Sequence, residues 1–129
     1  MIGSEQRWFA TAKTATRPEN MQEFHEDNML FVVDEAAGID DRIMEAILGT
    51  LSGENNKIIM MANPTKTSGI FFDAFHKDRA DWVNRKVSSL DSSRTNKKNI
   101  ERLIRRYGKD SDVVRVRVDG DFPLGEPNA

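Results

Sequence analysis

The stretch MLFVVDEAAG, residues 29–38, runs from an apolar segment directly into two adjacent acids. Residues 30–33 show no polar alternation, which is typical of a strand buried on both faces of a parallel sheet. Asp34 and Glu35 follow at its carboxyl end, the place where α/β sheets bind their ligands. Such carboxylates can bind a cation or activate water. An acidic pair that only caps a strand is also common, and the stretch alone leaves both interpretations open.

The residues after this stretch predict alternating helices and strands. Apolar side chains recur every three or four positions across residues 39–51, and Asp40 and Asp41 stand in the first turn, so we expect a helix there. Residues 57–62 predict a second buried strand. Further helices are expected at residues 69–77 and 96–107, and further strands at residues 8–13, 83–88 and 113–118.

This order of elements predicts an α/β fold, with a mainly parallel sheet flanked by helices. Residues 113–118 alternate valines with Arg115 and Arg117, which favours an outer or antiparallel strand near the C-terminal end. Residues 1–123 fit a single α/β domain, and residues 124–129 read as a tail or linker.

The bulk composition is that of a water-soluble globular domain. The chain has 129 residues, 38% hydrophobic and 31% charged, and no apolar run approaches the roughly 20 residues of a membrane span. There is no signal-peptide pattern at the start. The absence of cysteine excludes disulfides and thiolate metal sites, and His25 and His76 do not have the spacing of metal ligands.

Charge is distributed unevenly although the net charge is only -2. Residues 1–64 carry 5 basic against 11 acidic side chains, whereas residues 65–129 carry 14 against 10. A basic helix face can attract phosphate backbones, and it can equally be an ordinary solvated face. The densest basic run comprises Arg94, Lys97, Lys98, Arg102, Arg105 and Arg106.

The second predicted strand ends in MMANPTKTSG, residues 60–69. Polar residues there, one strand away from the acidic pair, could position water or sense a phosphate. The same letters also fit an ordinary turn in which Thr67 or Ser68 begins the next helix. The sequence contains no phosphate loop of the form Gly-x4-Gly-Lys-Ser/Thr. The nearest match is the pair Lys66 and Thr67, and no glycine precedes it.

With these residues placed, the sequence resembles the large terminase subunit of tailed phages and prophages, the ATP-driven motor that packages DNA. The resemblance covers residues 7–123. Its motifs are LFVVDEAAGIDDRIMEAILGTLSGENNKIIMMANPTKTSGIFFDAFHKDR (residues 30–79), VSSLDSSR (residues 87–94) and RYGKDSDVVRVRVDGDFP (residues 106–123).

The resemblance implies a partial P-loop NTPase core of the ASCE type, with ATP and Mg²⁺ as cofactors of the full-length protein. Asp34 would be the acid of the Walker B motif, associated with Mg²⁺ through water, and Glu35 would be the catalytic glutamate. The coupling motif, which links hydrolysis to DNA movement, would fall on Ala62, Asn63 and Pro64, with Thr65 beside it.

The resemblance also implies where this segment lies in a longer protein. The family's phosphate loop lies N-terminal of the Walker B strand, and its nuclease domain follows the GDFP segment. We therefore expect the C-terminal portion of an ATPase domain, with residues 124–129 leading towards a nuclease domain. The isolated chain is expected to be inactive and to require no cofactor of its own.

The family's partners are double-stranded DNA, the portal protein, the small terminase subunit and other copies of the large subunit, in the cytoplasm of a bacterial host and without a membrane. Two alternatives stay open. One is a non-catalytic DNA- or protein-binding module that uses the basic run. The other is a segment of a different P-loop translocase or helicase.

Overall fold

The computed structural model describes residues 10–12 and 27–125. Its strands are β1 (Asn28–Asp34) and β2 (Asn55–Met61), and its α-helices are α1 (Asp41–Thr50), α2 (Ile70–Phe75), α3 (Lys97–Tyr107) and α4 (Asp112–Val114). Short 3-10 segments are η2 (Ala36–Gly38), η3 (Arg79–Asp81) and η4 (Ser89–Asp91), and η5 (Arg115–Asp119) is π-helical.

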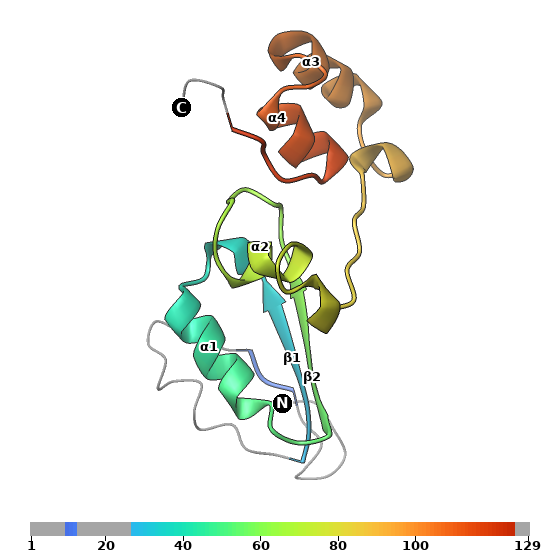
Figure 1. Ribbon diagram of the computed structural model, residues 1–129. Coiled ribbons are helices and arrows are strands. Elements are labelled where there is room, and N and C mark those ends of the chain that lie inside the picture. The colour runs from blue at the N-terminus through green and yellow to red at the C-terminus, as the bar shows by residue number, and fades with distance from the viewer. Residues whose placement is uncertain (1–9, 13–26, 126–129) are drawn as a thin grey trace.

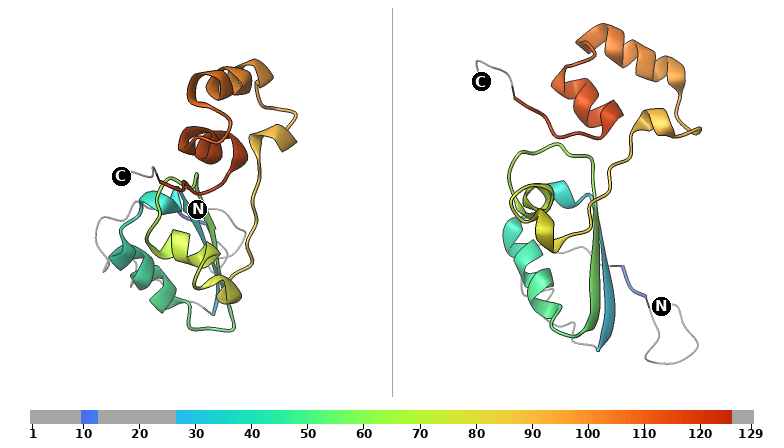
Figure 2. Two further views of the ribbon diagram at one scale, coloured as in Figure 1. Left: turned by 45° about the horizontal axis from the view of Figure 1, so that its top comes forward. Right: turned by 45° about the vertical axis from the view of Figure 1, so that its right-hand side comes forward.

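The two strands pair in parallel, with Val32 opposite Ile59 and Asp34 opposite Met61. The connection between them contains α1, as a parallel pair requires a crossover. Helices α1 and α2 lie on the same side of the sheet (Figures 1 and 2). The carboxyl ends of both strands therefore meet at one edge of the sheet.

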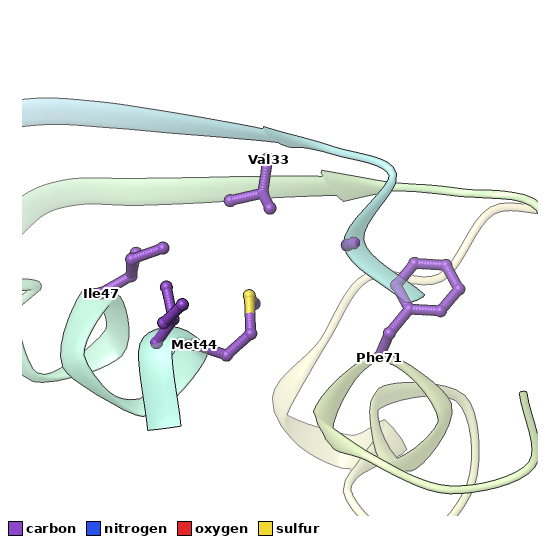
Figure 3. Packing of buried hydrophobic residues seen from close by; sticks show 6 residues of the cluster. Val33, Met44, Ile47 and Phe71 are labelled. Atoms are coloured by element: carbon purple, nitrogen blue, oxygen red, sulfur yellow. The ribbon is translucent and has the colours of Figure 1, made fainter. Parts of the chain in front are cut away.

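The core lies between the sheet and these two helices (Figure 3). Ile43, Met44 and Ile47 of α1 are buried against Val33 of β1 and Phe71 of α2. Ile43 and Met44 precede Ile47 by four and three residues, which places all three side chains on one helix face. Met44, at 1% exposure, is the most deeply buried of the group.

The opposite face of the sheet corrects the prediction that residues 30–33 are buried on both sides. Val33 is 6% exposed, but Leu30 and Val32 are 59% and 56% exposed, and Ile59 and Met61 are 50% and 45% exposed. The run is apolar on both faces, yet within the described part of the chain only one face is packed against helices.

Residues 89–119 form a second, helical unit with its own small core. Ile100 of α3 packs against Val114 and Val118, with Leu103 and Ile104 half-buried beside them. Asn96 caps α3, because its side-chain oxygen accepts hydrogen bonds from the backbone nitrogens of Lys98 and Asn99. An extended segment, residues 83–88, connects this unit to the α/β unit (Figure 1).

The predicted strand at residues 83–88 is wrong: the segment has no assigned strand and pairs with neither β1 nor β2. A cavity of about 720 Å³ separates Trp82, Val83 and their neighbours from β2. Val83 is 89% exposed. Alternating valines favour an extended backbone, but a strand also needs a hydrogen-bonded neighbour at strand spacing.

The predicted outer strand at residues 113–118 is also wrong, because α4 and η5 occupy those positions. Ser111 begins α4 by accepting a hydrogen bond from the backbone nitrogen of Val114. Val114 and Val118 are four residues apart and both contribute to the second core. The same valines satisfy a helical spacing as well as an alternating one, and tertiary packing selected the helix.

The remaining elements confirm the α/β prediction with a parallel pair of strands. The helices expected at residues 39–51, 69–77 and 96–107 and the strand at 57–62 all form, with ends shifted by a few residues. Of the strand expected at residues 8–13, only residues 10–12 are described, and they have no regular structure. Among the described helices, none is long and apolar enough to cross a membrane.

Candidate functional site at the carboxyl ends of the strands

A cavity of about 410 Å³ opens at the carboxyl ends of β1 and β2. Asp34 and Glu35 line it from the end of β1, and Ala62, Asn63 and Thr65 line it from the end of β2. We call it the acidic cavity. The parallel register brings these two groups together although the chain between them forms the whole of α1. Ala37, Gly38 and Ile39, which immediately follow the acidic pair, complete the wall.

The backbone of Glu35 has a left-handed conformation, with φ 52 and ψ 42. Among the described residues, it alone combines a positive φ with a side chain. Such a conformation costs a residue with a Cβ about 1–2 kcal/mol and is found preferentially at functional sites. It turns the chain sharply from β1 into η2, and the carbonyl of Glu35 accepts a hydrogen bond from the nitrogen of Gly38 at 3.0 Å.

The side chain of Asp34 supports this turn. Its Oδ1 accepts a hydrogen bond from the backbone nitrogen of Glu35 at 2.9 Å. Both acidic residues are exposed, so their carboxylates can be reached from solvent. The described residues contain no group of three or more acidic or histidine side chains that could hold a metal by themselves.

This donor set fits Mg²⁺ better than a metal held wholly by protein ligands. Mg²⁺ prefers oxygen ligands and keeps several waters, and it is usually bound through one or two carboxylates together with substrate phosphates. Asp34 and Glu35 offer those one or two carboxylates on an accessible wall.

The loop after β2 separates the acidic cavity from another one. Ala62 and Asn63 line both, whereas Pro64 is buried and lines only the second, which has a volume of about 680 Å³. We call this one the junction cavity, because it lies between the loop, α2, the connecting segment and Phe122. The loop contains a tight turn, in which the backbone nitrogen of Thr65 donates a hydrogen bond to the carbonyl of Asn63 at 2.8 Å.

The basic run lies away from this site, on the helical unit. Ile100 is buried and Leu103 and Ile104 are half-buried, so the opposite face of α3 is turned to solvent. All six basic side chains of the run are exposed: Arg94, Lys97, Lys98, Arg102, Arg105 and Arg106. The structure therefore places the acidic pair and the basic run in different units and does not bring them together.

His76 has a packing role, as its lack of metal-ligand spacing suggested. Its ring stacks on Phe72 at a centroid distance of 3.8 Å, and its Nδ1 lies 2.7 Å from the carbonyl oxygen of Phe72. His25 lies outside the described residues.

Two features of the site were missed by sequence reasoning. The left-handed backbone of Glu35 has no sequence signal, because glycine rather than glutamate usually marks such a position. The packing role of Phe122, in the segment DGDFPLG, is not predicted either, although a single large aromatic in a polar segment is a signal for a packing contact.

Comparison with known proteins yields neither a matching family model nor a matching solved structure. The fold and the acidic cavity define an α/β protein with an acidic pair at the end of a parallel strand. The chain is similar to a probable terminase, large subunit, of Enterobacteria phage P7, with 30% identity over 110 residues.

This match covers 79% of the chain and 22% of the phage protein, so the chain spans under a quarter of its relative's length. The similarity relates the chain to a phage terminase large subunit.

Proposed function

We propose that this chain is a segment of an ATP-driven motor that packages double-stranded DNA in a phage. The observation that carries the proposal is the acidic cavity, where Asp34 and Glu35 face the polar end of the neighbouring parallel strand. The similarity to a phage terminase large subunit supports it.

Within this proposal, Asp34 would hold the Mg²⁺ ion and Glu35 would accept the proton of the attacking water. ATP with Mg²⁺ supplies the phosphoryl group and the positive charge that stabilises the developing charge on its oxygens. Asn63 and Thr65 have polar side chains on the cavity wall and are suited to sense that group. Ala62 and Pro64 complete the proposed coupling loop.

The role of Glu35 is tested by Glu35→Gln in the longer polypeptide that contains this segment. Proton transfer of this kind contributes about 10²–10⁴-fold, so hydrolysis is expected to fall by that factor while nucleotide binding is retained. Glu54→Gln is the matched control, because Glu54 is an exposed glutamate in the turn before β2. Unchanged hydrolysis by Glu35→Gln would refute the role.

The isolated chain of 129 residues has no glycine-rich phosphate loop. We therefore expect it to bind ATP weakly and to hydrolyse little of it. Rapid turnover by the purified chain would contradict this expectation.

The basic face of α3 is proposed to contact the DNA backbone. Each lost phosphate contact should reduce the slope of log affinity against log salt by about 0.9 for duplex DNA. Arg102→Gln is expected to show this change, whereas Lys57→Gln, on an exposed position of β2, is not. Equal slopes for all three proteins would make α3 an ordinary solvated face.

A non-catalytic DNA-binding module is the second candidate, and the exposed basic face of α3 favours it. This alternative predicts that Arg102→Gln weakens DNA binding, while Glu35→Gln changes nothing in the longer polypeptide.

A further inference from the structure

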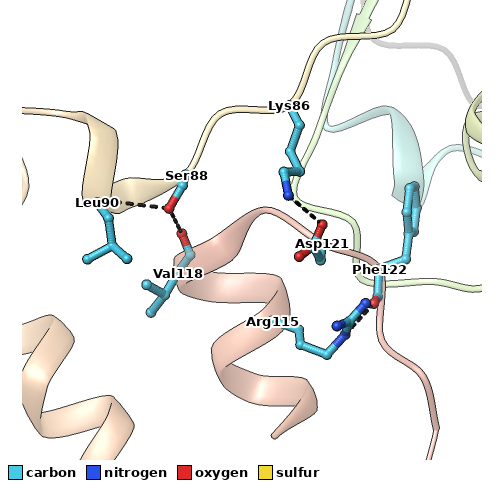
Figure 4. Close-up of polar contacts among 7 residues, drawn as sticks. All are labelled: Lys86, Ser88, Leu90, Arg115, Val118, Asp121 and Phe122. Carbon is cyan, nitrogen blue, oxygen red and sulfur yellow. Dashed lines mark hydrogen bonds and ion pairs between the residues drawn. The ribbon is translucent and has the colours of Figure 1, made fainter. Parts of the chain in front are cut away.

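The α/β unit and the helical unit are held together at the junction where the chain leaves one and returns to the other. Each unit has a separate apolar core, one centred on Met44 and the other on Val114 and Val118. Residues 83–88 lead out of the α/β unit, and residues 120–122 lead back towards it (Figure 4). The relative position of the units therefore depends on few contacts.

The outgoing and returning segments are joined by an ion pair, by a hydrogen bond from a side chain to the backbone, and by a close approach of their backbones. Lys86 Nζ lies 2.9 Å from Asp121 Oδ1, and Ser88 Oγ donates to the carbonyl of Val118 at 3.1 Å. Gly120, with φ 73, lies so close to the outgoing segment that a Cβ there would be 2.6 Å from the carbonyl oxygen of Val87. Only glycine fits this position without displacing backbone.

Phe122 belongs to both units at once. Its carbonyl accepts a hydrogen bond from Arg115 Nε of η5 at 3.0 Å (Figure 4), which fixes its backbone to the helical unit. Its ring packs among aromatic side chains of the α/β unit, with centroid distances of 5.2 Å to Phe72, 5.5 Å to Phe75 and 5.1 Å to His76. Edge-to-face contacts at such distances are favourable beyond simple burial.

Phe122 shares a cavity with the loop that forms a wall of the acidic cavity. Phe122 lines the junction cavity together with Ala62, Asn63 and Pro64, and Ala62 and Asn63 also line the acidic cavity. Contacts thus run from Ile100 of α3 through Val114 and Arg115 to Phe122, whose ring lies 6.1 Å from that of Phe71. Ala62 of the loop packs against the same core cluster as Phe122.

We propose that Phe122 is a positioning residue. It makes the conformation of the loop of residues 62–65 depend on the position of the helical unit. The inference deepens the proposed function, because it names the physical link between the basic face of α3 and the acidic cavity. Phe122 itself touches no reacting atom in this scheme.

The test uses the whole chain and requires neither nucleotide nor DNA. Because the sequence has no cysteine, Glu54→Cys and Glu101→Cys provide unique sites for spin labels, one in each unit. Phe122→Ala should broaden the distribution of label distances, and Phe122→Tyr, which keeps the ring, should restore it. Leu124→Ala is the control, because Leu124 is 76% exposed.

Amide hydrogen exchange then tests transmission to the loop. In Phe122→Ala, exchange of the Thr65 amide, which donates to the carbonyl of Asn63, should become at least about tenfold faster, while exchange at Val33 in β1 stays unchanged. A narrow distance distribution in Phe122→Ala, or unchanged exchange in the loop, would overturn the proposal. Equal acceleration in β1 would also overturn it, since that result indicates only global destabilisation. A failure of ATP or DNA binding would not alter either measurement.

Discussion

Replacing Glu35 with glycine is expected to stabilise the fold although it removes a proposed catalytic side chain. Glu35 has φ 52 and ψ 42, a conformation that is unfavourable for a residue with a Cβ. The hydrogen bond from its backbone nitrogen to Asp34 Oδ1 does not involve its side chain and is kept in the variant. The substitution therefore changes the backbone energy without breaking this contact.

The magnitude follows from two opposing effects. Relief of the left-handed conformation contributes about 1–2 kcal/mol. The greater freedom of glycine in the unfolded chain costs about 0.4–1 kcal/mol. The net gain is therefore about 1 kcal/mol, which for a domain of this size raises Tm by about 4 °C.

The assay is urea unfolding of the 129-residue chain, with Glu35→Ala and Glu54→Gly as controls. Glu35→Ala keeps a Cβ, so it should retain the strain and show no gain. Glu54 is an exposed glutamate in a turn and does not have a positive φ, so Glu54→Gly should lose about 0.4–1 kcal/mol. A rise in the midpoint without a change in slope would show that the native state was stabilised.

The reasoning is refuted if Glu35→Gly is destabilised to the same extent as Glu54→Gly. It is also refuted if Glu35→Ala gains as much as Glu35→Gly, because the benefit would then come from removing the carboxylate. If Glu35→Gly is more stable than the native chain and Glu35→Ala is not, the backbone at Glu35 is strained. A turn with a purely structural role would not be expected to keep such strain.

Gly120→Ala is expected to destabilise the chain by more than 1 kcal/mol in urea unfolding, because the new Cβ would lie 2.6 Å from the carbonyl oxygen of Val87. Gly49→Ala is its control: Gly49 lies in α1 with nothing within 4 Å of a new Cβ, so alanine should stabilise the helix by about 0.5–1 kcal/mol. A neutral Gly120→Ala would contradict the close approach of the two segments. Stability should also depend on pH through Asp40, because the hydrogen bond from the Arg42 side chain lowers the pKa of Asp40 below 3.8. The charged form is favoured in the folded state, so the stabilisation is present above pH 3.8 and is lost as the pH falls through the lower, folded-state pKa. The difference in urea midpoint between the native chain and Asp40→Asn should therefore shrink below pH 3.8, and a constant difference would show that the Arg42 contact is not formed.

The helices and the parallel pair were predictable because their signals are local and mutually consistent. Asp40 accepts a hydrogen bond from the nitrogen of Arg42, and Asn96 does the same for two nitrogens of α3, so α1 and α3 each begin at a capping side chain. Gly108, with φ 95, follows directly after α3. Apolar spacing then decided which face of each helix is buried.

The two wrong strands depended on contacts that no local pattern contains. Val114 and Val118 fit a strand and a helix equally well, and burial against Ile100 decided between them. Residues 83–88 have a strand-like sequence, but a strand also requires a hydrogen-bonded neighbour. The start of this segment and β2 line a cavity instead of pairing.

The meeting of Asp34 and Glu35 with the end of β2 could be predicted because parallel strands align their carboxyl ends. The backbone strain at Glu35 and the double role of Phe122 could not, since both arise from the folded context. The chemical roles of these residues stay predictions until the variants are measured.

The exposed apolar face of the sheet has a consequence for handling the protein in solution. Leu30, Val32, Ile59 and Met61 form a strip on a two-stranded sheet, and Lys57, opposite Leu30, is a charged side chain at its border. Apolar strips on short sheets promote association between molecules, and a lysine at the border opposes it. Among the described residues, this strip is therefore a surface at which two copies of the isolated chain are expected to associate as its concentration rises.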